Sequence, residues 1–184
     1  HHRLAEAVVQ GYQGDDGDLG RPGRMMATLK HFAGYGLALA GRDYAAVEAS
    51  PATLMRIMEP FRAAIDAGAG AVMVAFSTLN DMPATAHRVL LTDVLRQRFG
   101  FKGMVVTDFT AINPELVNHG IAANAREAAY LAFTAGVTVD LVSCAFLNHL
   151  EALVSEGRIS EAEVTARCRL VLEGFPDLSA GHGD

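Results

Sequence analysis

Four short apolar runs, separated by stretches with helical periodicity, constrain the fold of this chain more than any other feature. The runs are rich in Val, Met, Leu and Phe, and they cover residues 27–32, 71–76, 104–109 and 137–142. Runs of this kind are typical of strands that are buried on both faces of a parallel sheet. Helices that alternate with such strands predict an α/β fold.

The segments between the runs carry signals for the starts and stops of helices. Ser50 is a predicted N-cap, and Pro60 is expected to kink or break the helix that follows it. A second helix is predicted over residues 124–135 and should stop at Gly136, while Ser160 begins a capping-box pattern. Helices therefore alternate with strands along the whole chain.

Two architectures combine parallel strands with alternating helices: an open doubly wound sheet and a (β/α)₈ barrel. No glycine-rich phosphate loop follows any of the four runs, so the barrel is favoured. A full barrel has eight strands and typically about 250 residues. With 184 residues and four predicted strands, the chain is expected to form half of a TIM-type barrel, about four βα units.

The charge and the hydrophobic content of the sequence exclude some classes of binding partner. The sequence is 51% hydrophobic and has a formal charge of -6 without any Lys/Arg cluster, so it lacks the basic surface that binds nucleic acid, and a neutral substrate fits better. No apolar run approaches the roughly 20 residues of a membrane span. Cys144 and Cys168 are expected to be core thiols. No metal site is predicted from the remaining histidines, because they lack ligand spacing: His87, His119 and His149.

Polar residues interrupt or follow the apolar runs near the predicted strand ends. In βα proteins the working residues cluster at the carboxyl ends of the strands. The candidates are Lys30, His31, Ser77, Asn80 and Asp108. A further carboxylate, Asp140, falls inside the fourth run and is expected to serve structure, because a buried polar partner would satisfy it.

Asp108 is the sharpest of these candidates. A carboxylate that is delivered to a strand end can attack an anomeric carbon, form a glycosyl ester and later release it. The same position would also suit a helix cap for the residues from Thr110 onward. The spacing alone favours neither interpretation.

Lys30 and His31 place two adjacent polar side chains within an apolar run, which is costly unless both find partners. They would either donate hydrogen bonds to sugar hydroxyls or bind a neighbouring carboxylate of the barrel. A lysine at a barrel strand end could also form a Schiff base with a carbonyl substrate, as in an aldolase.

Beyond these single residues, the sequence closely resembles glycoside hydrolase family 3, with the bacterial β-glucosidases as the nearest type and β-xylosidases close by. The resemblance extends from about residue 12 to about residue 172 and rests on an ordered series of segments: 30–36, 41–44, 71–76, 91–96 and 100–109. It implies that residues 1–184 are part of the N-terminal barrel domain, in its C-terminal half, with a divergent tail over 174–184.

The resemblance also implies roles for individual residues. Asp108 would be the nucleophile of a retaining double displacement, and no cofactor is implied. The substrate-binding residues would be Lys30, His31, Met73, Phe76 and Phe109. The acid/base of the family is commonly a glutamate in an α/β sandwich domain that follows the barrel. No residue here corresponds to it, so the acid/base is expected from outside this chain.

Several residues depart from the family pattern. Phe76 stands where many members carry a tyrosine, and Phe109 stands where tryptophan is frequent, which implies changes in affinity and specificity. A subgroup that acts on N-acetylglucosaminides uses a histidine-aspartate pair in the loop after the lysine-histidine segment. Residues 34–37 lack that subgroup's proline and second histidine.

The expected function is release of β-linked glucose or xylose from the non-reducing end of a β-glucoside or oligosaccharide. Its partners would be the missing half of the barrel and the sandwich domain of the parent enzyme, with no nucleic acid and no membrane. The alternative is a catalytically incompetent fragment or pseudoenzyme that binds sugars weakly and pairs through open sheet edges as a homodimer. The location stays open, with a periplasmic or secreted parent in keeping with the resemblance.

Overall fold

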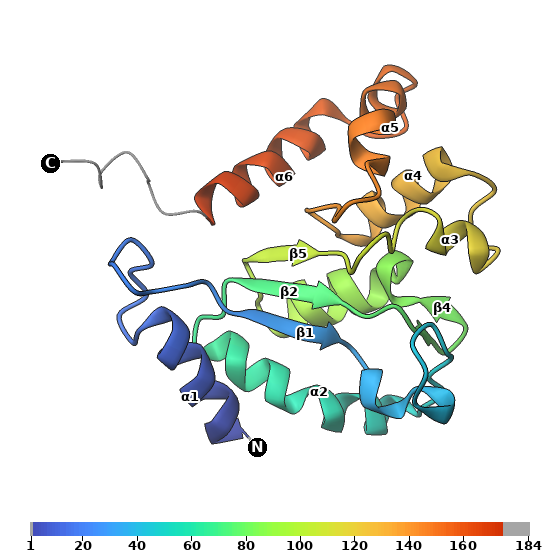
Figure 1. Ribbon diagram of the computed structural model, residues 1–184. Helices are drawn as coiled ribbons and strands as arrows, with labels where there is room; N and C mark the ends of the chain where they lie inside the picture. Colours follow the sequence, from blue (N-terminus) through green and yellow to red (C-terminus); the bar gives the residue numbers. More distant parts are fainter. Residues whose placement is uncertain (1, 175–184) are drawn as a thin grey trace, which may run out of the picture.

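A three-stranded parallel sheet lies at the centre of the computed structural model, which describes residues 2–174 (Figure 1). Its strands are β1 (Thr28–Phe32), β2 (Ala71–Val74) and β5 (Met104–Val106), hydrogen-bonded in the order β1-β2-β5. The first three predicted runs therefore form strands, and the prediction of an α/β fold with a parallel sheet is confirmed.

The fourth run, residues 137–142, does not form a regular strand, contrary to the prediction. Val139 makes a single parallel bridge with Val106. The Thr138 hydroxyl donates to the Val105 carbonyl (2.9 Å) and accepts from the Val105 N–H (2.8 Å). The backbone at Val142 then has a φ of 76°, outside the extended region. Backbone bonds also join this run to β5, from the Val139 N–H to the Val105 carbonyl (3.1 Å) and from the Thr107 N–H to the Val139 carbonyl (3.0 Å), so the run pairs with β5 at one bridge instead of along a strand.

Helices flank the sheet on both sides. Figure 1 shows two of them along the β1 side: α1 (His2–Gln13) and α2 (Pro51–Asp66). The chain runs through η4 (Val89–Arg98), which has π-helical hydrogen bonding, before it enters β5. The remaining helices follow β5: α3 (Glu115–Asn118), α4 (Ala125–Ala135), α5 (Ala145–Ser155) and α6 (Glu161–Glu173).

The predicted helix caps are present. The Ser50 side chain accepts the Thr53 N–H at 3.2 Å, and a reciprocal capping box joins Ser160 to Glu163. Pro60 is expected from the sequence to kink or break its helix; it does not break it, because α2 continues through it to Asp66. The loss of one internal hydrogen bond is tolerated in a 16-residue helix whose apolar face is packed against the core.

The loops that follow β1 and β2 are joined to each other. The first contains η1 (Tyr35–Leu37) and η2 (Leu39–Gly41), and the second contains β3 (Thr78–Leu79), β4 (Met82–Pro83) and η3 (Ala84–Ala86). Val47 of the first loop bridges Leu79 of the second. The Asn80 side chain accepts the Ala49 N–H at 3.0 Å and donates to the Ala49 carbonyl at 3.1 Å. Asn80, a candidate site residue from sequence, therefore holds these loops together.

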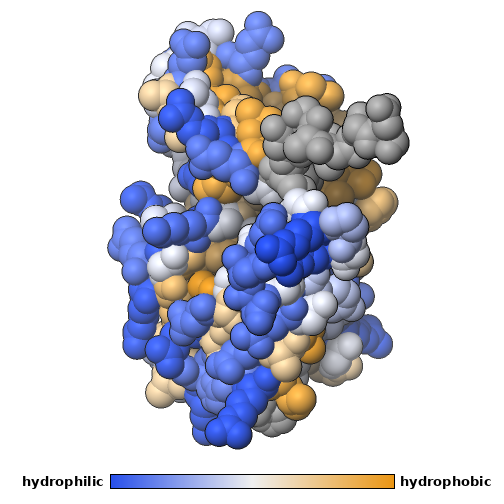
Figure 2. All heavy atoms as spheres, turned by 90° about the vertical axis from the view of Figure 1, so that its left-hand side faces the viewer, coloured by the Kyte–Doolittle hydropathy of each residue, from blue (hydrophilic) through white to orange (hydrophobic). Residues whose placement is uncertain are grey.

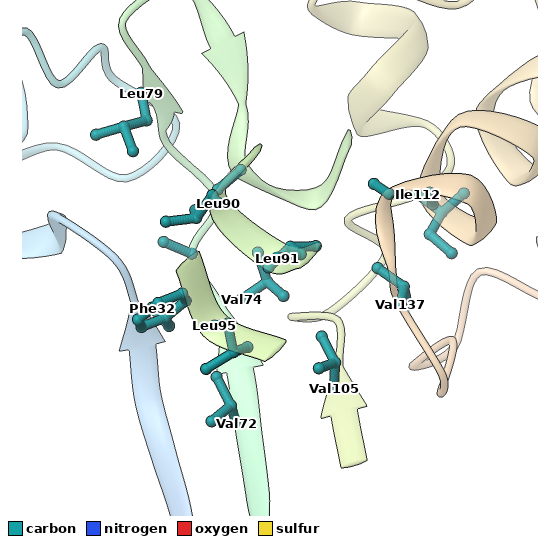
Figure 3. Close-up of a cluster of buried hydrophobic side chains, with 14 of the residues drawn as sticks. Phe32, Val72, Val74, Leu79, Leu90, Leu91, Leu95, Val105, Ile112 and Val137 are labelled. Carbon is teal, nitrogen blue, oxygen red and sulfur yellow. The ribbon is translucent and has the colours of Figure 1, made fainter. Parts of the chain in front are cut away.

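The main hydrophobic core forms where η4 packs on the sheet. Leu91 and Leu95 of η4 lie beside Val72 and Val74 of β2 and Phe32 of β1 (Figure 3). All five side chains are fully buried. Burial of one such side chain contributes about 1.5–3 kcal/mol, so this cluster fixes the strand ends that carry the polar candidates.

A buried glutamine, which the sequence patterns do not single out, closes the amino-terminal side of the sheet. Gln13, at the end of α1, is 4% exposed. Its side chain donates to the Gly68 carbonyl (2.8 Å) and accepts from the N–H groups of Ala27 (2.8 Å) and Gly70 (3.0 Å). One side chain thus connects α1 to the segments that lead into β1 and β2.

Both cysteines are exposed, so the expectation that they are core thiols is wrong. Cys168 lies on α6, a helix with no fully buried residue. Cys144 lies in the turn that precedes α5, at a φ of 55°. The face toward the amino-terminal ends of the strands is mostly hydrophilic with small apolar groups (Figure 2). Within residues 2–174, no helix combines the length and apolarity needed to cross a membrane.

Candidate active site

His31 and Asp108 meet at the carboxyl edge of the sheet. The Nε2 atom of His31, on β1, lies 3.2 Å from the Oδ2 atom of Asp108, which follows β5. The two side chains are 21% and 15% exposed, so they are shielded but reachable. The sequence leaves two interpretations of His31, sugar binding and binding of a neighbouring carboxylate. Both remain compatible with this position, because the neighbouring carboxylate is the candidate nucleophile itself.

Two local contacts hold the Asp108 carboxylate in place. Its Oδ1 atom accepts the N–H of Phe109 at 2.7 Å. The preceding residue, Thr107, is buried, and its hydroxyl accepts the Leu141 N–H at 2.9 Å. No helix starts at Thr110, since the residues after Asp108 form turns until α3. The interpretation of Asp108 as a helix cap is therefore wrong.

A tyrosine covers the other side of the His31 ring. The centroids of the Tyr35 and His31 rings are 4.7 Å apart, with an angle of 35° between their planes. The Tyr35 hydroxyl is hydrogen-bonded to the Asp43 carboxylate. This bond is the main reason why the pKa of Tyr35 is raised, and the negative charges of Asp43 and Asp108 contribute to the same effect.

A second aromatic pair lies at the same edge of the sheet. The ring centroids of Tyr44 and Phe76 are 4.4 Å apart. Tyr44 has a φ of 65°, which is unusual for a bulky residue. Partial burial raises its pKa, and the negative charges of Glu115, Asp43 and Asp108 raise it further. Tyr44 is therefore within electrostatic reach of the candidate nucleophile.

The other predicted binding residues lie on the strands or directly after them. Lys30 is exposed and lines a cavity of about 410 Å³ together with His31 and Tyr35. Met73 is half-buried on β2 and is in register with Val106 of β5. Phe109 is 57% exposed beside Asp108. The structure brings His31 into direct contact with Asp108, whereas Lys30 faces the cavity at the β1 edge.

Two further polar candidates differ in role. The Asp140 carboxylate accepts the hydroxyl of Ser143 (2.6 Å) and the N–H of Phe146 (3.2 Å), so it organises the start of α5, in line with the structural interpretation. Ser77 follows β2 and is 1% exposed, and its hydroxyl has no hydrogen-bond partner in the described part of the chain. Among residues 2–174, no cluster of three or more His, Cys, Asp or Glu side chains is arranged to hold a metal ion.

Residues 1–173 match the family described as "Glycosyl hydrolase family 3 N terminal domain". The chain belongs to this family. It is 42% identical over 155 residues to "Periplasmic beta-glucosidase" from Salmonella typhimurium, an alignment that covers 84% of this chain and 20% of that protein. It is 35% identical over 142 residues to "Beta-xylosidase" from Formosa agariphila, which covers 76% of this chain and 20% of that protein.

Solved structures of family members have the same fold. The beta-glucosidase from Listeria innocua superposes with a TM-score of 0.90 at 36% sequence identity, over 94% of this chain and 24% of that chain. The exo-1,3/1,4-beta-glucanase from a Pseudoalteromonas species superposes with a TM-score of 0.82 at 31% identity, over 93% of this chain and 21% of that chain. The chain thus spans about a fifth to a quarter of the length of these relatives.

Sequence reasoning missed Tyr35, Asp43 and Tyr44 as parts of this centre. All three lie in the loop after β1, where they count as members of a family segment without any individual role. The available signal was an aspartate and two tyrosines within a glycine-containing loop that directly follows Lys30 and His31. The folding of that loop over His31 decides their contacts, and it is not visible in the local pattern.

Proposed function

We propose that this family 3 chain provides the nucleophile of a retaining glycoside hydrolase that releases β-linked glucose, or xylose, from non-reducing ends. The carrying observation is that Asp108 is held at a strand end by the Phe109 N–H and His31 while it stays 15% exposed. A carboxylate fixed in this way is suited to attack on a sugar carbon.

In the first step of the proposed mechanism, a carboxylate oxygen of Asp108 forms a bond to the anomeric carbon as the bond to the leaving oxygen breaks. An acid outside this chain gives its proton to the leaving oxygen. In the second step the same group takes a proton from water, which attacks the anomeric carbon and releases the carboxylate. The two displacements retain the configuration of the sugar.

The side chains around Asp108 supply the two kinds of contact that a sugar needs. Lys30 and His31 can donate hydrogen bonds to its hydroxyls. Met73, Phe76 and Phe109 present apolar surface for its C–H faces, and Phe109 is the most open of them at 57% exposure. The side of Phe76 that contacts Tyr44 is already occupied, so Phe76 acts with Tyr44 as a unit.

The chain would act as the C-terminal half of a (β/α)₈ barrel whose other half packs against β1. A cavity of about 520 Å³ between α1, α2 and β1 supports this arrangement. Large apolar side chains line it although they are more than half exposed: Leu4, Val8, Tyr12 and Met25. An apolar surface of this kind is typical of an interface. The proposed domain covers residues 1–184, and most of its divergent tail, 175–184, lies outside the described residues.

Covalent trapping tests the nucleophile. The protein that carries this chain is incubated with a 2-deoxy-2-fluoro β-glucoside that has a good leaving group, digested, and analysed by mass spectrometry. A glycosyl adduct is expected on the peptide that contains Asp108, and the Asp108→Asn variant should give no adduct. Asp93→Asn, on the exposed side of η4, serves as the matched control and should be labelled like the wild type.

An active preparation that is not labelled on this peptide would contradict the assignment of Asp108. A second candidate function is a non-catalytic fragment or pseudoenzyme with weak sugar binding. It is favoured by one observation, namely that the parallel sheet within residues 2–174 has three strands, whereas a full barrel has eight. Absence of aryl β-glucosidase and β-xylosidase activity, together with weak binding of glucose in calorimetry, would support this alternative. Sedimentation velocity then tests the homodimer.

A further inference from the structure

Tyr35 and Asp43 form an outer layer around the pair of His31 and Asp108. The Tyr35 ring lies 4.7 Å from the His31 ring, on the first turn after β1. Its hydroxyl reaches the Asp43 carboxylate, which follows η2. The contacts therefore run from Asp43 to Tyr35, then to His31, and then to the carboxylate of Asp108.

Within the described residues, a local hydrogen bond holds the Asp108 side chain, whereas none of this kind holds the His31 side chain. Asp108 is fixed by the adjacent Phe109 N–H, at 2.7 Å. The Nε2 atom of His31 lies 3.2 Å from the Asp108 carboxylate, and rotation about the two side-chain bonds of His31 would break this contact. A stacked ring with an anchored hydroxyl restricts that rotation, and aromatic pairs of this kind contribute about 0.5–1.5 kcal/mol beyond their buried area.

The fold of the loop does not depend on the bond between Tyr35 and Asp43. Backbone bonds hold the loop independently, from the Leu39 N–H to the Ala46 carbonyl (3.0 Å) and from the Val47 N–H to the Thr78 carbonyl (2.9 Å). Tyr35 is itself 38% exposed, so it adds little to the core. Its two side-chain contacts therefore fit a role in holding His31 better than a role in stabilising the fold.

We propose that Tyr35, anchored by Asp43, is a positioning residue that fixes the imidazole of His31 against the carboxylate of Asp108. Tyr35 acts through His31 and does not contact the reacting atoms. The consequence for turnover rests on the proposed glycosidase function, whereas the positioning of His31 can be measured without any activity.

Nuclear magnetic resonance tests the positioning directly. The protein is labelled with ¹⁵N-histidine, and the His31 signal is assigned from its loss in His31→Gln. Asp108→Asn removes the charge beside Nε2 and should shift the Nε2 resonance in the wild-type background. In a Tyr35→Leu background the same substitution should shift it roughly threefold less, because a ring that is no longer held spends less time beside residue 108.

Two less disruptive variants allow the same test if Tyr35→Leu disturbs the loop. Tyr35→Phe keeps the stacked ring and loses the anchor, and Asp43→Asn removes the charged acceptor of the same hydroxyl. Both should reduce the response to Asp108→Asn by less than Tyr35→Leu does. Tyr130→Phe, on α4 beside Arg158, is the matched control and should leave the response unchanged. Equal responses in the wild type and in all Tyr35 and Asp43 variants would overturn the proposal.

The effect on turnover gives a second test, whose negative result can be told apart from failure of the proposed glycosidase function. Tyr35→Leu should lower kcat roughly tenfold with a smaller change in KM, and in a His31→Ala background it should cost little more, because both changes break one chain of contacts. Full additivity of the two changes would contradict a role through His31. An inactive wild-type protein that shows the expected resonance behaviour would instead contradict the proposed glycosidase function and leave the positioning of His31 established.

Discussion

The Nε2 atom of His31 lies 3.2 Å from the Oδ2 atom of Asp108, although β2 separates the two strands that carry them. The contact exists because parallel strands end at one edge of the sheet, so side chains from β1 and β5 can reach across the end of β2. Residues from distant parts of the sequence are thereby combined into one site.

The contact makes His31 a target for a first prediction. His31→Ala should lower kcat/KM for an aryl β-glucoside by roughly tenfold to a hundredfold, because it removes the imidazole that lies against the Asp108 carboxylate and is proposed to bind a sugar hydroxyl. Steady-state kinetics on the purified protein measure the change. His149→Ala, on α5, is the control and should retain wild-type kinetics. Wild-type kinetics for His31→Ala would remove His31 from the site.

A second prediction concerns the stability that Gln13 provides. Gln13→Ala should lower the free energy of unfolding by about 2–3 kcal/mol, because it leaves the buried Ala27 N–H and the partly buried Gly68 carbonyl and Gly70 N–H without this partner. Urea denaturation measures the loss. Gln10→Ala removes an exposed glutamine from the same helix and should change stability little. Equal losses in the two variants would refute the role of Gln13.

The pH dependence of stability should reveal His87. Burial lowers the pKa of His87 below its usual value of 6.5, and its Nδ1 atom accepts the Leu90 N–H at 3.3 Å, which requires an unprotonated nitrogen. As the pH falls through the pKa of the unfolded histidine, the unfolded chain binds a proton that the folded chain does not. The free energy of unfolding therefore decreases as the pH falls.

The His87→Asn variant isolates this effect, since asparagine keeps an acceptor for the Leu90 N–H and does not titrate. Between about pH 7.5 and pH 5.5 the variant should lose less stability than the wild type, as measured by urea denaturation at both pH values. His2→Asn, at the exposed start of α1, is the control and should behave as the wild type. Identical losses in the wild type and His87→Asn would show that His87 does not contribute.

The exposure of the cysteines leads to a fourth prediction. Cys144 and Cys168 are both free and exposed, so both thiols should react with a thiol reagent such as dithiobis-nitrobenzoate in the absence of denaturant. Absorbance measures the number of thiols modified per chain, and Cys168→Ser should remove one of them. A folded protein that reacts only after unfolding would contradict the exposed positions.

Much of the fold follows from local patterns in the sequence. The runs that form β1, β2 and β5 are uniformly apolar, and Ser50 and Ser160 cap helices as their chemistry predicts. The fourth run pairs with β5 at a single bridge, because its backbone leaves the extended conformation at Val142. Pro60 does not end α2, because packing of the helix outweighs the local preference of proline.

The site follows a similar division. The positions of Lys30, His31 and Asp108 at strand ends are predictable, because strand direction alone places them at one edge. The contacts of Tyr35 and Asp43 depend on how the loop after β1 folds back, and that path is fixed by pairing with the loop after β2. Long-range pairing of this kind leaves no periodic trace in the sequence.

The hydroxyl of Thr138 also bears on how copies of this sheet could misassemble. A strand with free backbone groups offers a template on which a foreign strand can add, and repeated addition leads to fibres. At Val105 both backbone groups that face this side are already bonded, to the Thr138 hydroxyl and to the N–H groups of Thr138 and Val139, so an added strand has no free group to pair with there. The chain thereby restrains growth of the sheet on the β5 flank with its own residues.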